Sequence, residues 1–286
     1  MNLIHPSVEK WNSDERISHV ARCARVCYAS KTDNELSNLK LYQSLEDKGH
    51  TSMFRHESHY YIIYRNNDKK FYKNLYNELV KYTYCDYFSY IHDKGILYIA
   101  TNGDFYRNKR FNKLNRLIED YEVCKEIFES HEIGFLLLRH TFCVITQIST
   151  SRELNRTSPN NIAEQSTRYV NFDKKGGITI CLPHWWNEAS WFKKTIHMLY
   201  WKGSEIMYNF LLKIGFKPQD ARGVLPLDTA TKCVYTYSVN EWDHILDLRL
   251  RGKTGKPHPN AVIIAEQINQ SLQEYGYDFN KLLINF

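Results

Sequence analysis

Charged and hydroxyl side chains gather most densely between Ser151 and Tyr169. This segment holds three arginines and two glutamates among its serines, and its candidate residues are Arg152, Arg156, Arg168, Glu153, Glu164 and Ser166. The planar guanidinium group of arginine can donate two parallel hydrogen bonds to a phosphate group, and a serine hydroxyl can donate another. The same composition also describes a solvent-exposed helix surface with ion pairs. Composition alone therefore leaves two interpretations open, an anion-binding site and an ordinary helix surface.

Sequence motifs of other catalytic and nucleotide-binding classes are absent. There is no Gly-rich phosphate loop of the Walker or Rossmann type, no His-Glu-x-x-His and no Gly-x-Ser-x-Gly. His50 and His56 are the nearest approach to a metal-ligand pair, but no carboxylate completes a set, so we expect no metal site. A nucleotide site in this chain must be built from side chains and helix ends.

The bulk composition describes an ordinary folded protein of 286 residues, with 43% hydrophobic and 24% charged residues. A net charge of +6 suits an anionic partner, from a nucleotide to a nucleic acid. The seven cysteines are scattered without a Cys-x-x-Cys pair, which disfavours disulfides and zinc, and we expect Cys27 and Cys143 to be core residues. No apolar run is long enough to cross a membrane, so we expect a cytoplasmic protein.

Hydrophobic spacing predicts helices and strands in no regular alternation, which favours an α+β fold with a largely antiparallel central sheet flanked by helices. We expect strands at 59–65 and 141–146, and an apolar run at 96–100. Hydroxyl groups at 149–151 are expected to cap a helix that ends by Pro159. The other predicted helices cover 15–30, 35–48, 69–82, 104–130, 189–215, 217–223, 259–275 and mainly the second half of 232–251.

Four segments, in the same order along the chain, resemble the flavin-dependent thymidylate synthases. The first is Ala24-Arg-Val-Cys-Tyr-Ala-Ser30, and the second is Gly49-His-Thr-Ser-Met-Phe-Arg-His56 followed by a strand. The third runs from Arg152-Glu-Leu-Asn-Arg156 to Glu164-Gln-Ser-Thr-Arg-Tyr169 and occupies the place of the family's Arg-His-Arg-(seven residues)-Ser signature. The fourth is Asp220-Ala-Arg-Gly-Val-Leu-Pro226, which continues to Leu246-Asp-Leu-Arg249.

This resemblance implies one catalytic domain over residues 1–286, with residues 66–135 as a probable insertion, and a homotetramer that shares its sites between subunits. The implied reaction is transfer of a one-carbon unit from 5,10-methylenetetrahydrofolate to C5 of dUMP, with FAD and NADPH supplying reducing equivalents. The protein would then hold a nucleotide dianion and polarise the pyrimidine ring.

The positions that match the family's nucleotide site are intact. The resemblance implies that Arg249 activates the pyrimidine ring and that Ser166 also takes a catalytic role. The implied substrate-binding residues are Glu153, Glu164, Ser166, Arg168, Arg222 and Arg249.

The positions that match the family's flavin site have changed. The signature's Arg-His-Arg reads Arg156-Thr157-Ser158, and Arg55 stands in place of a glutamate. Each lost charged contact to a flavin would weaken binding by ~1.5–3 kcal/mol. The residues that remain to approach a flavin, by resemblance, are His50, Ser52, Arg55, Arg156, Asn161, Ser238 and His244.

Three explanations for this altered motif stay open. Flavin binds with charge supplied by Arg55 or the insertion; or the enzyme hydroxymethylates dUMP without net reduction or transfers a one-carbon unit to dCMP; or the protein binds nucleotides without catalysis. Basic and aromatic residues interleave at 69–73 and 107–113, a pattern found in single-strand binders but more often in solvated helix surfaces. We therefore expect nucleotide and folate as ligands in preference to nucleic acid.

Overall fold

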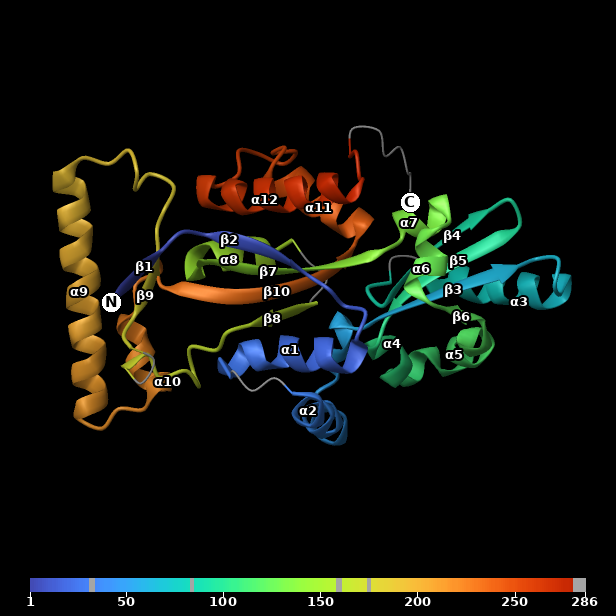
Figure 1. The fold of residues 1–286 in the computed structure, drawn as a ribbon, viewed down its shortest axis with the longest axis horizontal. Helices are drawn as coiled ribbons and strands as arrows, with labels where there is room; N and C mark the ends of the chain where they lie inside the picture. Colours follow the sequence, from blue (N-terminus) through green and yellow to red (C-terminus); the bar gives the residue numbers. More distant parts are fainter. Residues whose placement is uncertain (31–33, 83–84, 158–160, 174–175, 280–286) are drawn as a thin grey trace.

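The computed structural model of the chain describes residues 1–30, 34–82, 85–157, 161–173 and 176–279, and an antiparallel sheet of four strands lies at its centre (Figure 1). β7 and β10 pair along their whole lengths, from Arg139 opposite Ser238 to Gln147 opposite Ala230. Both strands are rich in aromatic and β-branched residues, which pack well on a pleated surface. In spatial order the four strands are β2 (Ser7–Trp11), β7 (Arg139–Gln147), β10 (Ala230–Ser238) and β8 (Ile162–Glu164).

Helices cover both faces of this central sheet. Successive side chains of β7 point to opposite faces, so Phe142 packs with α11 (Val239–Arg249) and α12 (Pro259–Tyr275) while Cys143 packs with α1 (Arg16–Tyr28). Figure 1 shows α11 and α12 above the sheet, and α1 and α2 (Glu35–Asp47) below it. The predicted α+β class with an antiparallel sheet is confirmed.

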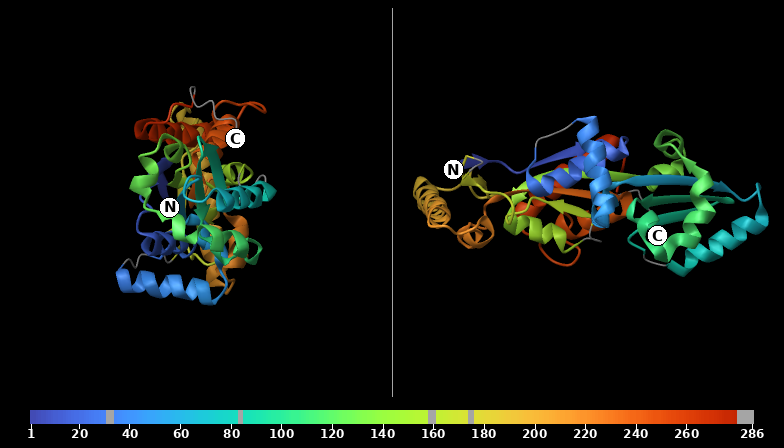
Figure 2. Two further views of the ribbon diagram at one scale, coloured as in Figure 1. Left: turned by 90° about the vertical axis from the view of Figure 1, so that its right-hand side faces the viewer. Right: turned by 90° about the horizontal axis from the view of Figure 1, so that it is seen from below.

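A second antiparallel sheet stands beside the first, and residues 66–135 supply three of its four strands (Figures 1 and 2). Its core is dominated by aromatic side chains such as Phe88, Phe105 and Phe111. The prediction that residues 66–135 are an insertion stays a prediction. The strands, in spatial order, are β4 (Phe88–Asp93), β5 (Ile96–Asn102), β3 (Ser58–Tyr64) and β6 (Glu122–Val123).

The predicted long helix at 104–130 is wrong. Asn108 leaves the helical conformation and caps a new turn with its side chain, which ends the first short helix. Further along, Val123 is drawn into the ladder opposite Tyr60 of β3, so tertiary pairing overrides helix propensity there. The segment contains α4 (Asp104–Arg107), η3 (Lys109–Phe111), α5 (Asn112–Ile118), η4 (Glu119–Tyr121), β6 and α6 (Lys125–Glu129), and α7 (Glu132–Leu136) follows.

Most other predicted elements are confirmed within a few residues. The second half of 232–251 is helical as α11, whereas its first half lies in β10, the partner of β7. The predicted hydroxyl cap at 149–151 is wrong, because α8 (Ile148–Asn155) begins after Gln147 without a side-chain cap, and Pro159 lies outside the described residues. The remaining elements are β1 (Asn2–Ile4), η1 (Thr51–His56), α3 (Lys69–Leu79), η2 (Val80–Tyr82), β9 (Thr179–Cys181), α9 (Trp191–Lys213), α10 (Pro218–Ala221) and η6 (Arg222–Val224).

Helix α9 stands at the edge of the molecule, packed against α10 and η6 (Figures 1 and 2). Its 23 residues would be long enough for a membrane, yet within the described part of the chain no helix combines that length with sufficient apolar character.

Candidate functional site

A cleft of about 640 Å³ opens where α8, the end of β8 and η6 meet. Three of the predicted nucleotide-binding residues line it, namely Glu164, Ser166 and Arg222. Glu164 and Ser166 lie at and just after the end of β8, whereas Arg222 of η6 is distant along the chain and is held here by its hydrogen bond to Thr167. The other lining residues are Ile148, Arg152, Gln165, Thr167, Gly223, Leu225, Pro226 and Leu227.

The carboxylate of Glu164 is held in a fixed orientation on one wall of this cleft. Its Oε1 accepts hydrogen bonds from the hydroxyls of Ser151 (2.8 Å) and Thr231 (3.1 Å), and its Oε2 accepts one from Nδ2 of Asn155 (3.1 Å). Asn155 is in turn oriented by Tyr235, whose buried hydroxyl donates to Oδ1 of Asn155 at 2.8 Å. All these donors are neutral, so Glu164 faces the cleft as an acceptor with no cation among these partners.

Two arginines line the same cleft on its solvent side. Arg152 and Arg222 are exposed, and Arg222 donates from Nη1 to the hydroxyl of Thr167 at 3.1 Å. Arg168 follows Ser166 closely; its backbone N–H donates to the Ser166 hydroxyl (3.1 Å), and its side chain donates to Gln219 (3.3 Å). The cleft lining contains two arginines and one glutamate, so its net charge is positive, which suits a phosphate monoester.

Arg249, the predicted ring-activating residue, is not among the residues that line the cleft. It lies in the last turn of α11, where Nε and Nη2 donate to the backbone carbonyl of Glu153 at 3.0 and 2.6 Å. Its Nη1 also lies 3.7 Å from Oε2 of Glu153. Because Glu153 belongs to the last turn of α8 and follows Arg152, Arg249 stabilises the helix that carries part of the cleft wall.

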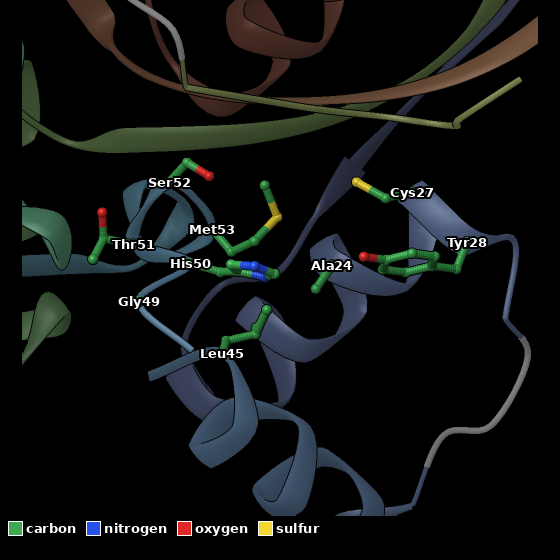
Figure 3. Close-up of a pocket in the computed structure, with 9 residues that line it drawn as sticks. All are labelled: Ala24, Cys27, Tyr28, Leu45, Gly49, His50, Thr51, Ser52 and Met53. Atoms are coloured by element: carbon green, nitrogen blue, oxygen red, sulfur yellow. The ribbon is translucent and has the colours of Figure 1, made fainter. Parts of the chain in front are cut away.

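A second cavity of about 330 Å³ lies between α1 and the segment that joins α2 to η1 (Figure 3). It contains His50 and Ser52, two of the predicted flavin-contacting residues. Figure 3 shows Cys27 and Tyr28 of α1 facing that segment across the cavity. Burial raises the pKa of the Cys27 thiol, which keeps it protonated at neutral pH and unsuited to act as a nucleophile.

The described lining of this second cavity fits only part of a flavin. Apolar and small side chains with one imidazole and three hydroxyls suit an aromatic ring system. None of the described lining residues is an arginine or a lysine that could pair with the diphosphate of FAD. The lining is Ala24, Cys27, Tyr28, Leu45, Gly49, His50, Thr51, Ser52 and Met53.

The two cavities are neighbours, joined by direct contacts. The backbone N–H of Ser166, in the first cavity, donates to the carbonyl of Cys27, in the second, at 3.0 Å. The exposed rings of Tyr28 and Tyr169 lie 5.6 Å apart between centroids. A ligand in the cleft would therefore lie close to one in the second cavity.

The remaining predicted flavin residues lie elsewhere in the fold. Arg55 does not line the second cavity; its Nε donates to Asp104 at 3.0 Å and its Nη2 to the Tyr87 hydroxyl at 3.1 Å. Ser238 is buried as the N-cap of α11, in reciprocal hydrogen bonds with Glu241.

Asn161 is fully buried before β8, and its side-chain amide forms no hydrogen bond within the described residues. Arg156 and His244 are exposed, on the turn after α8 and on α11. Thr157 of the altered signature is buried and donates to the carbonyl of Leu154, whereas Ser158 lies outside the described residues.

A chain of buried polar groups crosses the sheet behind the second cavity. His19 lies 3.2 Å from the Thr141 hydroxyl, which lies 2.8 Å from that of Thr236, which lies 2.8 Å from Nδ1 of His56. Burial lowers the pKa of His19 to about 4 and holds that of His56 well below its ordinary value. Both histidines are therefore neutral in the folded protein near pH 7.

Several residues of the site were not predicted from the sequence. Asn155 of α8 and Thr231 of β10 bond Glu164, and Tyr235 of β10 bonds Asn155. Asn155 lies in the third family-like segment, whereas no motif marks Thr231 and Tyr235, which strand pairing brings to the site. Tyr28 had a visible signal, since it belongs to the first family-like segment. Among the described residues, no group of three His, Cys, Asp or Glu side chains is arranged to hold a metal ion.

Comparison with known proteins places this chain in a family. Residues 107–275 match the model of the family described as thymidylate synthase complementing protein. The match covers more than half of the chain, so the chain belongs to that family. A flavin-dependent thymidylate synthase from Synechocystis sp. is 23% identical over 158 residues, which cover 53% of this chain and 67% of that protein.

Two solved structures of the UMP/dUMP methylase PolB from Streptomyces cacaoi, bound with 5-Br dUMP and 5-Br UMP, are also similar to this chain. Each is 17% identical with a TM-score of 0.45 and covers 96% of this chain. The alignments cover 93% and 91% of the two PolB chains.

Proposed function

We propose that this protein transfers a one-carbon unit from 5,10-methylenetetrahydrofolate to C5 of dUMP and thereby forms dTMP. Membership of the thymidylate synthase complementing family supports the reaction class, and the Synechocystis relative is a flavin-dependent thymidylate synthase. The observation that carries the proposal is the positive cleft in which Glu164, Ser166, Arg152 and Arg222 meet.

In this proposal the cleft binds the nucleotide by its phosphate and orients its base. Arg222, Arg152 and the Ser166 hydroxyl take the phosphate dianion, and Arg168 adds positive charge at the rim. The fixed carboxylate of Glu164 accepts a hydrogen bond from the sugar or the pyrimidine N–H, which sets the angle of the ring.

Arg249 takes the ring-activating role only by releasing the carbonyl of Glu153 and turning into the cleft. A guanidinium beside the pyrimidine carbonyls would stabilise negative charge that develops as C5 becomes nucleophilic. Glu153 then serves to position this arginine.

The second cavity takes the isoalloxazine ring of FAD in this proposal, with His50 and Ser52 beside it. Bound flavin would supply reducing equivalents drawn from NADPH, while this chain orients the ring and excludes water. In this proposal another subunit of a homotetramer supplies cations for the diphosphate, since none of the described lining residues is an arginine or a lysine. Helix α9 presents an exposed stripe at helical spacing for such an assembly: Phe192, Ile196, Leu199, Ile206, Met207 and Phe210.

Non-reductive transfer is the second candidate, in which the product carries a hydroxymethyl group. Two observations favour it: the His and second Arg of the signature are replaced, and the described lining of the second cavity lacks a cation. A transfer of formaldehyde-level carbon without reduction needs no flavin.

An FAD titration of the purified protein, with and without dUMP, separates the two candidates. Reductive transfer predicts that FAD absorbance and fluorescence change at micromolar FAD and that turnover yields dTMP. Non-reductive transfer predicts no flavin binding at tens of micromolar and a product heavier than dTMP by one oxygen. Failure of dUMP to bind under either condition would refute the proposed function altogether.

A further inference from the structure

Helix α3, on the second sheet, turns a face of lysine and asparagine toward solvent. At 3.6 residues per turn, the exposed positions of α3 fall within an arc of about 140°. The exposed residues of α3 are Lys69, Lys70, Lys73, Asn74 and Asn77, and Val80 and Lys81 extend the same face into η2. No acidic side chain lies on this face of α3; Asp68 is its N-cap and Glu78 is buried beneath it.

The neighbouring α5 and η3 continue this basic face. Glu78 joins the two elements, because its Oε2 accepts hydrogen bonds from Lys81 of η2 and Lys113 of α5, each at 2.7 Å. One buried carboxylate thus holds two exposed ammonium groups side by side and leaves a net positive charge. The exposed residues that η3 and α5 add are Lys109, Arg110, Asn112, Lys113 and Arg116.

Basic and acidic residues are unevenly distributed within residues 66–135. Six of the eleven acidic residues of this segment follow the basic face, in η4, β6, α6 and α7: Glu119, Asp120, Glu122, Glu126, Glu129 and Glu132. A surface built only for solubility intersperses the two signs. The separation therefore calls for an anionic partner at α3 and α5.

We propose that the basic face formed by α3, η2, η3 and α5 binds the phosphate backbone of nucleic acid. The interleaved asparagines can hydrogen-bond phosphate and sugar oxygens, as side-chain amides do in nucleic-acid complexes. The face is about 18 Å long from Lys69 to Lys81, the length of about five base pairs, so it reaches several phosphates. Contacts to phosphate and sugar carry no base information, so binding here is independent of base sequence.

An acidic protein surface and an anionic membrane fit this face less well than nucleic acid. The cores of protein interfaces are depleted in lysine and enriched in Trp, Tyr and Met, whereas the exposed charged residues here are mainly lysine. A membrane-binding helix carries Trp, Phe or Leu beside its cations, and Val80 is the one exposed apolar side chain on the described α3–η2 face.

Fluorescence anisotropy of the full chain with labelled single- and double-stranded DNA of mixed sequence tests this proposal. Binding is expected with Kd on the order of 10⁻⁶ to 10⁻⁴ M at physiological salt, and log K should fall against log salt with a slope of about −3 to −5. The two arms decide which form of nucleic acid the face prefers. No binding to either form at low salt would overturn the proposal.

Matched charge variants locate the binding on this face. Lys73→Glu combined with Lys109→Glu should weaken binding at least tenfold and reduce the salt slope by about two. The control, Lys40→Glu combined with Lys256→Glu, changes net charge equally at exposed residues on α2 and on the loop after α11. Equal weakening in both double variants, or tighter binding to poly-glutamate or phosphatidylserine vesicles than to DNA, would overturn the proposal. Binding of dUMP should stay unchanged in all variants, so the result is separate from the proposed enzyme activity.

Discussion

The side chains that hold Glu164 act in series, and this arrangement predicts a specific pattern of coupling between two substitutions. The Tyr235 hydroxyl donates to Oδ1 of Asn155, and Nδ2 of Asn155 donates to Oε2 of Glu164. Tyr235→Phe removes one neutral hydrogen bond worth about 1 kcal/mol, which corresponds to roughly fivefold in affinity. Asn155→Ala removes a hydrogen bond to a charged group, worth ~1.5–3 kcal/mol or roughly 10- to 150-fold.

The double variant is expected to bind dUMP no more weakly than Asn155→Ala alone, because the Tyr235 hydroxyl acts on Glu164 through its hydrogen bond to Asn155. The coupling free energy should then equal the whole effect of Tyr235→Phe. Isothermal titration calorimetry with dUMP on the four proteins of this cycle measures it directly.

Tyr72→Phe is a matched control, because Tyr72 is a buried tyrosine of α3, in the core under the second sheet, whose hydroxyl has no hydrogen-bond partner within the described residues. It should leave dUMP affinity unchanged. Additive losses in the double variant would refute the serial arrangement, and an unchanged affinity in Asn155→Ala would refute the role of Glu164 in binding.

Three further predictions concern other parts of the molecule. Arg249→Ala should reduce turnover at least a hundredfold. It should also lower the free energy of unfolding by about 1 kcal/mol, because the carbonyl of Glu153 loses its hydrogen-bond donor. Steady-state rates and urea denaturation measure the two effects, and full activity would exclude a catalytic role for Arg249. Acid should destabilise the fold between about pH 6.5 and 4.5: buried histidines with a lowered folded pKa add stability above the unfolded value near 6.5, and each loses roughly 1.4 kcal/mol per pH unit below it. The histidines concerned are His19, His56 and His140. The midpoint of urea unfolding, measured across this pH range, reports the loss of stability, and a midpoint that does not change with pH would contradict the prediction. Leu199→Glu on the exposed stripe of α9 should convert the proposed tetramer into smaller species in light scattering, whereas Glu188→Lys, outside the stripe, should not. An unchanged mass for Leu199→Glu would exclude this face as an interface.

The sequence predicted the helices that carry their own local signals. α1, α2 and α12 show apolar residues at helical spacing, and their predicted ranges agree with the structure within a few residues. The long helix predicted at 104–130 failed because its residues include a side-chain cap at Asn108 and a strand partner at Val123. Local spacing alone does not distinguish an isolated short helix from a continuous one.

The candidate site divides in the same way between local and long-range information. Glu164, Ser166 and Arg168 lie within a span of five residues, so their spacing in the sequence predicted that they cluster. The family resemblance added Arg222. The second cavity was anticipated by the segment that carries His50 and Ser52. The roles of these residues in binding stay predictions.

Only the tertiary structure decided what surrounds them. The register of β8 and β10 places Cys233 opposite Glu164, and this brings Thr231 and Tyr235 within reach of Glu164 and Asn155. The packing of η1 against α4 likewise sets the hydrogen bond from Arg55 to Asp104. The sequence determined which residue types were present and how they clustered locally, because propensity and short-range spacing depend on near neighbours in the chain. Orientation, partners and shared faces depended on hydrogen bonds between residues that are distant along the chain, which exist only once strands are in register and helices are packed.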